Sequence, residues 1–363
     1  MRRIVTLLAT MLVLAPLAAP VATAQVEPEP VWKTSPVGQE HLYLVDIQAK
    51  GGAMFALGQA EDPWSGLPAV LRKVGDKWVR LPAPDKTNYL LYGMAVGGPN
   101  SVWVVGVGNA DSRDTTPLLM HWNGRTWTEI KGPDVPAGQF GEIKIAPDGA
   151  LWVAGWARIG DREPGVVYRY AGGKWQPLTA GLEDSINGNV LTVFSNTDAW
   201  LGLNAGLAHW DGKTWTYVGS VPTDGSVIPV AMANRGTKDI WLTGVQHTGG
   251  PTGERPLVMR YDGRSWRSVE VPDTSGQLSD IAFWNGRPIA VGERFVDDGN
   301  HFSNYPLALR YDGSKFVTTT VPTPAGTEGT LSSLLATPSK LWTAGYTWTP
   351  SNPGYTPLAA FTK

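Results

Sequence analysis

One short phrase recurs seven times along this chain and constrains its fold more than any other feature. The phrase is a run of small or branched apolar residues around a large residue, ending in glycine. The five clear copies are Ser101-Val-Trp-Val-Val-Gly106, Ala150-Leu-Trp-Val-Ala-Gly155, Asp198-Ala-Trp-Leu-Gly202, Asp239-Ile-Trp-Leu-Thr-Gly244 and Leu341-Trp-Thr-Ala-Gly345. Weaker copies begin at Ala53 and Arg287. Self-similarity at a fixed period indicates an array of one supersecondary unit.

A second phrase follows six of the seven copies and predicts a β-hairpin. Examples are His121-Trp-Asn-Gly-Arg-Thr-Trp127 and Arg260-Tyr-Asp-Gly-Arg-Ser-Trp266. The Asn-Gly and Asp-Gly pairs are expected to form two-residue turns in which both central residues have positive φ. The apolar phrase adds a third strand to this hairpin, and a further apolar run before it adds a fourth. Each unit is therefore expected to be a four-stranded antiparallel sheet.

None of these sheets can be stable by itself, because both faces of each sheet are apolar. Arranged radially, each sheet buries its faces against its neighbours. We therefore predict an all-β fold, a seven-bladed β-propeller of four-stranded antiparallel blades. The last unit, residues 329–363, ends after three strands. The segment 29–38 carries Trp32 at the repeat's Trp position and is expected to complete this blade and close the ring.

The N-terminus has the pattern of a secretory signal peptide. Arg2 and Arg3 precede an apolar run over 4–19, and Ala22-Thr-Ala24 is a small-residue cleavage site. We predict a signal peptide over 1–24, a single propeller domain over 25–363 and a secreted, extracellular protein. A membrane anchor is the competing interpretation, but the run is short for a span and no second one follows, so no anchor is expected.

Composition excludes several function classes. The absence of cysteine excludes a disulfide scaffold, a Cys-ligated metal and a thiol nucleophile, and five His leave little room for a multi-His site. Lys and Arg number 30 against 32 Asp and Glu, without a basic run, so no nucleic-acid partner is expected. No cofactor is predicted. Whether a metal binds is left open: Asp297, Asp298, Asn300 and His301 share one loop, but their spacing matches no calcium loop.

Two of the hairpin turns, Asp211-Gly-Lys-Thr-Trp215 and Asp262-Gly-Arg-Ser-Trp266, are similar to the end of an Asp-box. On these residues the chain resembles the secreted bacterial propellers with Asp-box or kelch-type repeats. The leading Ser/Thr-x-Asp of the Asp-box and the Gly-Gly of kelch are absent. The resemblance implies an architecture and a superfamily, and leaves the function to be argued from the site.

Tryptophans that depart from the repeat mark a candidate binding surface. Of the 17 Trp, 13 fall on repeat positions, where packing between blades explains them. Trp64 and Trp348 instead lie in loops between the second and third strands of blades one and seven, which become neighbours on ring closure. The expected ligand-binding residues on this face are Trp64, Trp348, Tyr355, Asp62 and His301.

The inner strands suggest a second candidate site in the central channel. Alignment of the repeats places one residue per blade at equivalent positions: Asp46, Gly93, Glu142, Asn189, Pro229, Asp280 and Ser333. The three carboxylates Asp46, Glu142 and Asp280 suit an acid–base pair or a cation site, and they equally suit simple solvation by channel water.

Two function hypotheses follow. The leading one is a secreted, non-catalytic scaffold that binds a glycan or a protein through its loop-bearing face, and the sequence favours it over an enzyme. The alternative is an extracellular propeller hydrolase or lyase that uses the channel-mouth carboxylates. A deep pocket with two carboxylates within reach of each other favours the enzyme, whereas a shallow aromatic surface favours binding.

Overall fold

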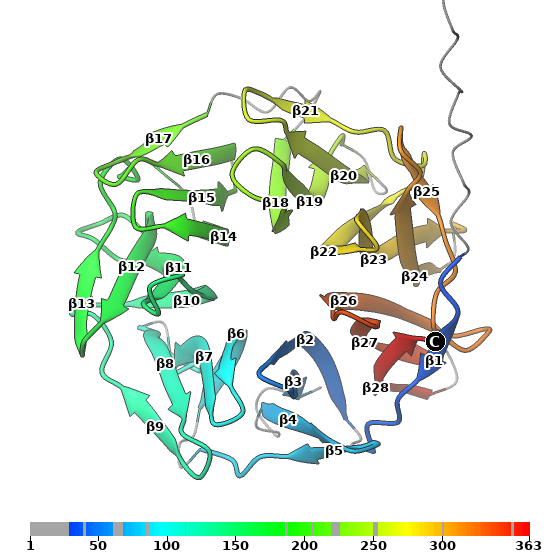
Figure 1. Ribbon diagram of the computed structural model, residues 1–363, viewed down its shortest axis with the longest axis horizontal. Helices are drawn as coiled ribbons and strands as arrows, with labels where there is room; N and C mark the ends of the chain where they lie inside the picture. Colours follow the sequence, from blue (N-terminus) through cyan, green and yellow to red (C-terminus); the bar gives the residue numbers. More distant parts are fainter. Residues whose placement is uncertain are drawn as a thin grey trace, which may run out of the picture.

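Seven four-stranded antiparallel sheets are arranged as the blades of a β-propeller around a central axis (Figure 1). This computed structural model describes residues 29–38, 41–60, 68–84, 88–112, 114–183, 185, 188–204, 206–218, 226–249, 253–299, 301–349 and 352–363. The predicted signal peptide lies outside the described residues. The predicted fold class and blade number are confirmed.

In each blade the strands run from the channel outward in chain order, as inner, second, third and outer strand. Blade one contains β2 (Leu42–Lys50), β3 (Ala53–Ala60), β4 (Ala69–Val74) and β5 (Lys77–Arg80). Blade two contains β6 (Tyr89–Gly98), β7 (Ser101–Gly108), β8 (Thr116–Trp122) and β9 (Trp127–Ile130). Blade three contains β10 (Gly138–Ile145), β11 (Leu151–Ala157), β12 (Gly165–Ala171) and β13 (Lys174–Pro177). Blade four contains β14 (Gly188–Ser195), β15 (Asp198–Leu203), β16 (Gly206–Trp210) and β17 (Trp215–Tyr217).

The remaining blades follow the same order. Blade five contains β18 (Ser226–Asn234), β19 (Ile240–His247), β20 (Glu254–Tyr261) and β21 (Trp266–Ser268). Blade six contains β22 (Gly276–Trp284), β23 (Arg287–Asp297), β24 (Phe302–Tyr311) and β25 (Phe316–Thr318). Blade seven contains β26 (Glu328–Ala336), β27 (Leu341–Thr349), β28 (Asn352–Thr362) and, as its outer strand, β1 (Trp32–Thr34).

The two ends of the chain meet in blade seven. β1 pairs antiparallel with β28, with Trp32 opposite Thr362. The same segment also contacts both neighbouring blades, because the Trp32 indole donates to the Thr320 carbonyl at 3.1 Å and the buried Trp78 indole donates to Ser35 Oγ at 3.1 Å. The N-terminal strand therefore completes the last blade and holds the ring closed.

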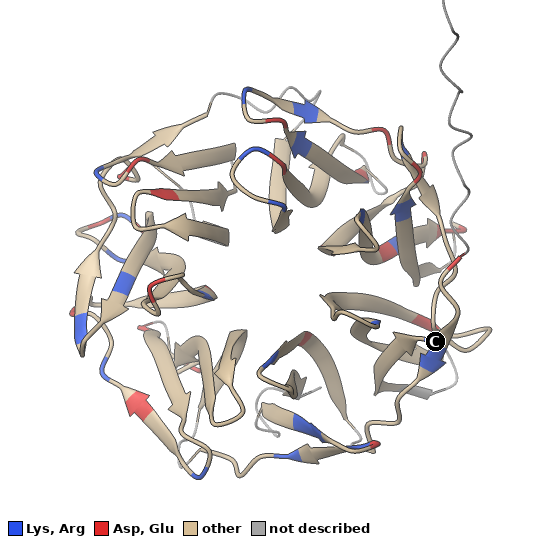
Figure 2. Ribbon diagram, in the orientation of Figure 1, with Lys and Arg blue, Asp and Glu red and all other residues tan. Residues whose placement is uncertain are grey.

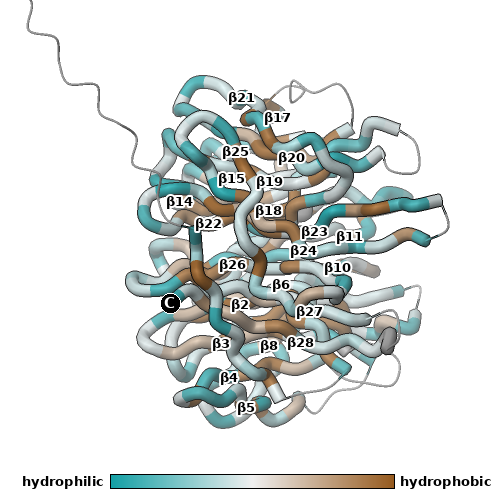
Figure 3. Tube along the Cα trace, turned by 90° about the vertical axis from the view of Figure 1, so that its right-hand side faces the viewer, coloured by the Kyte–Doolittle hydropathy of each residue, from teal (hydrophilic) through white to brown (hydrophobic). Residues whose placement is uncertain are grey.

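The hydrophobic core is divided among the interfaces between blades. In the described residues each pair of adjacent blades shares one buried cluster, including the pair formed by blades seven and one. Large aromatics of the repeat fill these interfaces, and Trp152 and Trp241 are almost fully buried. In side view, apolar residues concentrate in the middle of the disc and hydrophilic ones in the loops of its two faces (Figure 3).

The hairpins between third and outer strands differ from the predicted turn type. In blade two the loop has four residues, because Trp122 pairs with Trp127. The Asn123 side chain accepts the backbone N–H groups of Arg125 and Thr126, and Gly124 alone among these residues has positive φ. Asp211, Asp262 and Asp312 make the same contacts. The hairpins were correctly expected, but the carboxylate or amide side chain, rather than a second positive φ, forms most of these turns.

Charges of both signs are scattered around the ring (Figure 2). In the described part of the chain, no helix is long and apolar enough to cross a membrane.

Candidate functional site

Every inner strand contains a β-bulge at the same place. The register between inner and second strand shifts between Leu44 and Asp46 in β2, and between Leu331 and Ser333 in β26. The other five blades have the shift at the matching position. A bulge inserts one unpaired residue and bends the strand. The first residue that pairs again after each bulge therefore holds an equivalent place at the channel.

The glycine that ends the sequence repeat lies opposite this bulge. Gly155, for example, pairs with Phe140, and a Cβ at Gly155 would collide with the carbonyl oxygen of Gln139. Backbone carbonyls crowd Gly106, Gly244, Gly292 and Gly345 in the same way. In these five blades the repeated glycine is thus a packing requirement of the bent inner strand, whereas at Gly58 of blade one the nearest atoms would lie 3.5 Å from a Cβ.

The bulges correct part of the sequence alignment. Asp46, Gly93, Glu142, Asp280 and Ser333 occupy the expected positions. In blades four and five the equivalent residues are Val190 and Ala231 rather than Asn189 and Pro229, because the register shifts come at 188/190 and 229/231. The ring of channel residues therefore has a polar part, from blades six, seven, one and three, and an apolar part from blades four and five.

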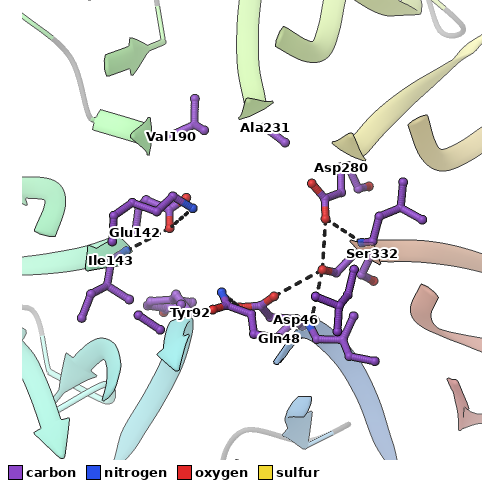
Figure 4. Close-up of a pocket in the computed structure, with 18 of the residues that line it drawn as sticks. Asp46, Gln48, Tyr92, Glu142, Ile143, Val190, Ala231, Asp280 and Ser332 are labelled. Carbon is purple, nitrogen blue, oxygen red and sulfur yellow. Dashed lines mark hydrogen bonds and ion pairs between the residues drawn. The ribbon is translucent and has the colours of Figure 1, made fainter. Parts of the chain in front are cut away.

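These residues line a cavity of about 550 Å³ in the channel (Figure 4). Its wall includes residues of all seven inner strands, from the bulges to residues such as Lys50 and Ile145 at the strand ends. The cavity therefore occupies the half of the channel on the side of the turns between inner and second strands. Trp348 and Tyr355 were expected in a loop but lie in strands, because β27 continues to Thr349 and β28 begins at Asn352. The end of β27 and the loop that carries His301 lie toward the opposite face.

Two carboxylates share one hydroxyl group in this cavity. Ser333 Oγ lies 3.2 Å from Asp46 Oδ1 and 3.0 Å from Asp280 Oδ2. Asp280 also accepts the backbone N–H groups of Leu334 at 2.6 Å and Ile281 at 2.7 Å. Asp46 accepts the Gln48 amide at 2.9 Å. The three strands concerned, β22, β26 and β2, belong to the adjacent blades six, seven and one.

The opposite wall carries an ion pair. Lys144 Nζ lies 3.1 Å from Glu142 Oε1, and both residues line the cavity from β10 because residues two apart on a strand share a face. Figure 4 labels Glu142 on this wall. The Lys144 side chain lines the cavity and remains 38% exposed. Burial alone would lower the pKa of Lys144, but the carboxylates of Glu142, Asp46 and Asp280 outweigh it and raise that pKa.

The environment shifts both bridged aspartates in the same direction. Burial, with the nearby Asp280 and Glu142 charges, raises the pKa of Asp46 to about 7, against the opposing effect of Lys144. Burial likewise raises the pKa of Asp280 to about 6, opposed by its hydrogen bonds from Leu334, Ile281 and Ser333. Two neighbouring carboxyl groups of this kind titrate as a coupled pair.

The hydrogen-bond geometry fits a pair that holds one proton. A serine hydroxyl has one hydrogen, so Ser333 donates to only one of the two aspartates. Asp280 accepts hydrogen bonds from two backbone N–H groups, so its negative charge is better stabilised than that of Asp46. With Ser333 donating to Asp280, and a protonated Asp46 donating to Ser333 Oγ, every short contact is satisfied. The backbone N–H of Ile47, 3.4 Å from Ser333 Oγ, takes the second acceptor position.

The candidate residues of the loop face are placed only in part. Trp64 and Asp62 lie outside the described residues. Trp348 donates its indole N–H to Glu328 at 3.1 Å and stacks on Tyr346, and Tyr355 packs against both rings. His301 is exposed, and its Nε2 lies 3.5 Å from Glu328 Oε1. Trp348, Tyr355 and His301 thus gather near Glu328, away from the carboxylate pair.

Neither candidate region is a recognisable metal centre. Among the described residues, no three His, Asp or Glu side chains come close enough to hold a metal ion. Asn300 of the loop considered as a cation site lies outside those residues.

Sequence reasoning missed Gln48 and Lys144 in the channel. Both stand two residues after a named acid, at Asp46-x-Gln48 and Glu142-x-Lys144. This spacing is the signal for a shared strand face, and it was available once the inner strands were assigned.

No protein-family model matches the chain, and no curated protein matches it. Solved structures are similar in fold. A structure of YCF48 bound to D1 peptide is 16% identical, with a TM-score of 0.55 over 93% of this chain and 98% of that one. The polysaccharide lyase Uly1 is 11% identical, with a TM-score of 0.58 over 90% and 93% of the two chains. The GH74 xyloglucanase from Xanthomonas campestris is 13% identical, with a TM-score of 0.57 over 90% of this chain and 55% of that one.

These findings correct the leading functional hypothesis. At such identities the likeness shows a propeller fold, and propellers of this shape include two polysaccharide-cleaving enzymes beside a peptide-bound protein. The fold thus gives no reason to prefer a non-catalytic scaffold that binds through its loops. The cavity has the feature expected of the alternative, two carboxylates within reach of each other. The hypothesis of a non-catalytic loop-face binder is therefore wrong, and the enzyme is favoured.

Proposed function

We propose that this protein is an exported glycoside hydrolase whose reacting groups are Asp46 and Asp280. One observation carries the proposal: a single hydroxyl, that of Ser333, bridges two carboxyl groups with raised pKa inside a channel cavity. Pairs of titratable groups whose environments hold one proton near neutral pH are typical of acid–base catalysis.

The two aspartates have different roles. Asp46, with the higher pKa, donates its proton to the oxygen of the leaving sugar. Asp280, held as an anion by two backbone N–H groups, attacks the anomeric carbon. The glycosyl ester is then hydrolysed by water, whose proton returns to Asp46. Ser333 positions both groups and keeps the proton of the pair on the Asp46 side.

The spacing of the pair supports a nucleophilic role for Asp280. Both carboxylates contact one Ser333 oxygen, so their nearest oxygens are separated by no more than two hydrogen-bond lengths. Retaining glycosidases have carboxyl groups about 5–5.5 Å apart, whereas inverting enzymes keep about 6.5–9.5 Å free for a water molecule. The upper limit for the Asp46–Asp280 pair, about 6.2 Å between nearest oxygens, lies below the inverting range and is compatible with the retaining one.

The lining of the cavity suits a sugar. The hydroxyls of Ser279 and Ser332 offer hydrogen bonds to sugar hydroxyls, as does the carbonyl oxygen of the Gln48 amide, whose N–H groups are used by Asp46 and Met94. Val190 and Ala231 offer an apolar wall to a ring face. The similar folds of a polysaccharide lyase and a xyloglucanase are compatible with such a substrate.

A polysaccharide lyase is the second candidate, and Lys144 is the observation that favours it. Its side chain lines the cavity that holds all three carboxylates, and all three act on its charge. There it would offset the charge of a uronate carboxylate and so acidify the adjacent C–H. Asp280 would remove that proton and Asp46 would protonate the leaving oxygen.

The proposal includes the location and architecture inferred from the sequence. Residues 1–24 direct export, residues 25–363 form one propeller domain, and the partner is an extracellular glycan. The Asp-Gly-x-x-Trp hairpin turns support a superfamily relationship to the Asp-box propellers.

The test is a panel of neutral and uronate-containing polysaccharides, with product measured as reducing ends and, for elimination, as the ultraviolet absorbance of an unsaturated sugar. We expect Asp46→Asn and Asp280→Asn each to lower kcat by about 10²-fold or more. Asp273→Asn, at an exposed carboxylate on the rim, is the control and is expected to keep full activity. Wild-type protein that cleaves nothing on the panel, or undiminished activity in both channel variants, would show that the proposal is wrong.

A further inference from the structure

The reacting carboxylates lie inside a closed ring rather than in an open cleft. The inner strands of all seven blades contribute to the wall of the cavity, so protein surrounds it on every side perpendicular to the axis. A substrate therefore approaches Asp46 and Asp280 along the channel axis.

The carboxylates also lie well below the rim. Asp46 stands four residues before Lys50, where β2 ends, and Asp280 stands four residues before Trp284, where β22 ends. At about 3.3 Å per strand residue, this places them roughly 13 Å from the ends of their strands. The cavity of about 550 Å³ is of a size that holds a small ligand rather than a polymer segment.

From this geometry we infer that the enzyme acts on chain ends or short oligosaccharides and releases small units from a terminus. The inference rests on the proposed function. For an internal bond to reach Asp46 and Asp280, the polymer would have to fold back and leave through the opening by which it entered, or thread one of its ends through the closed ring first. A chain end enters alone, with its terminal ring between the polar wall at Ser333 and the apolar wall at Val190 and Ala231 (Figure 4).

The chain offers a variant that closes the channel without disturbing the fold. Gly141 lines the cavity as the bulged residue of β10, its φ is not positive, and a Cβ there meets no atom within 4 Å. Gly141→Phe places a ring in the open space of the channel. Gly141→Ala is the matched control, because it adds one methyl group in the same direction.

The experiment compares product sizes on a polysaccharide that the wild-type protein degrades. We expect reducing ends to accumulate while viscosity stays nearly constant, and chromatography to show mono- or disaccharides from the first minutes. Oligosaccharides with both terminal rings chemically capped are expected to resist cleavage. Gly141→Phe is expected to lose at least about 90% of the activity, and Gly141→Ala a smaller part of it, because it fills less of the channel.

The possible failures are distinguishable. A rapid fall in viscosity with large early fragments would overturn the inference of terminal action and leave the proposed hydrolase standing. Full activity in a folded Gly141→Phe variant would show that the chemistry takes place outside the channel. An absence of any cleavage by the wild-type protein would be a failure of the proposed function itself.

Discussion

Ser333 determines how the two aspartates behave as a pair. The side chain is almost fully buried, and its oxygen contacts one carboxylate from each neighbouring blade. The sequence placed all three residues at the channel, but it gave no sign that they touch. Ser333 and Asp46 are 287 positions apart, and only ring closure brings them together. A contact of this kind depends on the direction of side chains across the closed ring, which the repeat does not encode.

Burial sets the pH range of the proposed reaction, and Lys144 moves it to lower pH. Activity requires an ionised Asp280 and a protonated Asp46, so the profile of kcat/KM rises as pH passes about 6 and falls as it passes about 7. The Lys144 charge lowers both pKa values. Lys144→Gln is therefore expected to move both limbs of the profile to higher pH, by up to about 1 unit.

The measurement is the pH dependence of kcat/KM on one substrate. Lys174→Gln, on the outer strand of the same blade, is the control and is expected to leave the profile in place. If the pH profile of the Lys144→Gln variant were unchanged or shifted to lower pH, the electrostatic role of this lysine would be contradicted.

At the scale of the strand, the repeat predicted the elements well and their register less well. Four strands per blade follow from the alternating apolar runs and the turn residues. The bulge in each inner strand does not, because one unpaired residue leaves the apolar pattern almost unchanged while shifting every later side chain. Asn189 and Pro229 were misassigned for this reason, and Val190 and Ala231 take their places.

The glycine opposite the bulge yields a prediction about stability. Gly155→Ala puts a methyl group onto the Gln139 carbonyl and is expected to cost about 2 kcal/mol or more. Gly58→Ala is the matched control at the same position of blade one, where the nearest atoms lie 3.5 Å from the new Cβ. That change is expected to be neutral or slightly stabilising, since alanine restricts the unfolded chain.

The measurement is the free energy of unfolding of the Gly155→Ala and Gly58→Ala variants in urea, each compared with the wild-type protein. Equal losses of stability would mean that the repeated glycine has a cause other than the crowding of the inner strand.

At the scale of the whole molecule, closure determines whether the site exists. The carboxylate pair spans blades six, seven and one, and the N-terminal segment fastens these three blades together. Val37 is buried in the cluster between blades seven and one, close in sequence to the Ser35 contact with Trp78. The missing fourth strand of the last unit made this arrangement predictable from the sequence.

Deleting residues 29–38 tests the closure. The change removes the pairing of β1 with β28 and leaves the buried Trp78 indole without its acceptor. We expect a fall in Tm of about 5 °C or more, on the scale of lost core contacts. Lys33→Ala, on the exposed side of the same strand, is expected to change Tm by about 1 °C or less. A deletion variant with the same Tm as the intact protein would show that the stability of the ring does not depend on its N-terminal strand.

The most direct measurement is the titration of Asp46 and Asp280 themselves, since the proposed catalysis requires the pair to hold one proton near neutral pH. Protein labelled with ¹³C in the aspartate carboxyl groups, with the two signals assigned from Asp46→Asn and Asp280→Asn, gives both apparent pKa values by NMR without knowledge of the substrate. We expect two coupled steps, at about 7 and about 6. Two independent titrations near the ordinary aspartate value of about 4 would contradict the account, because both groups would then be ionised and no acid would remain.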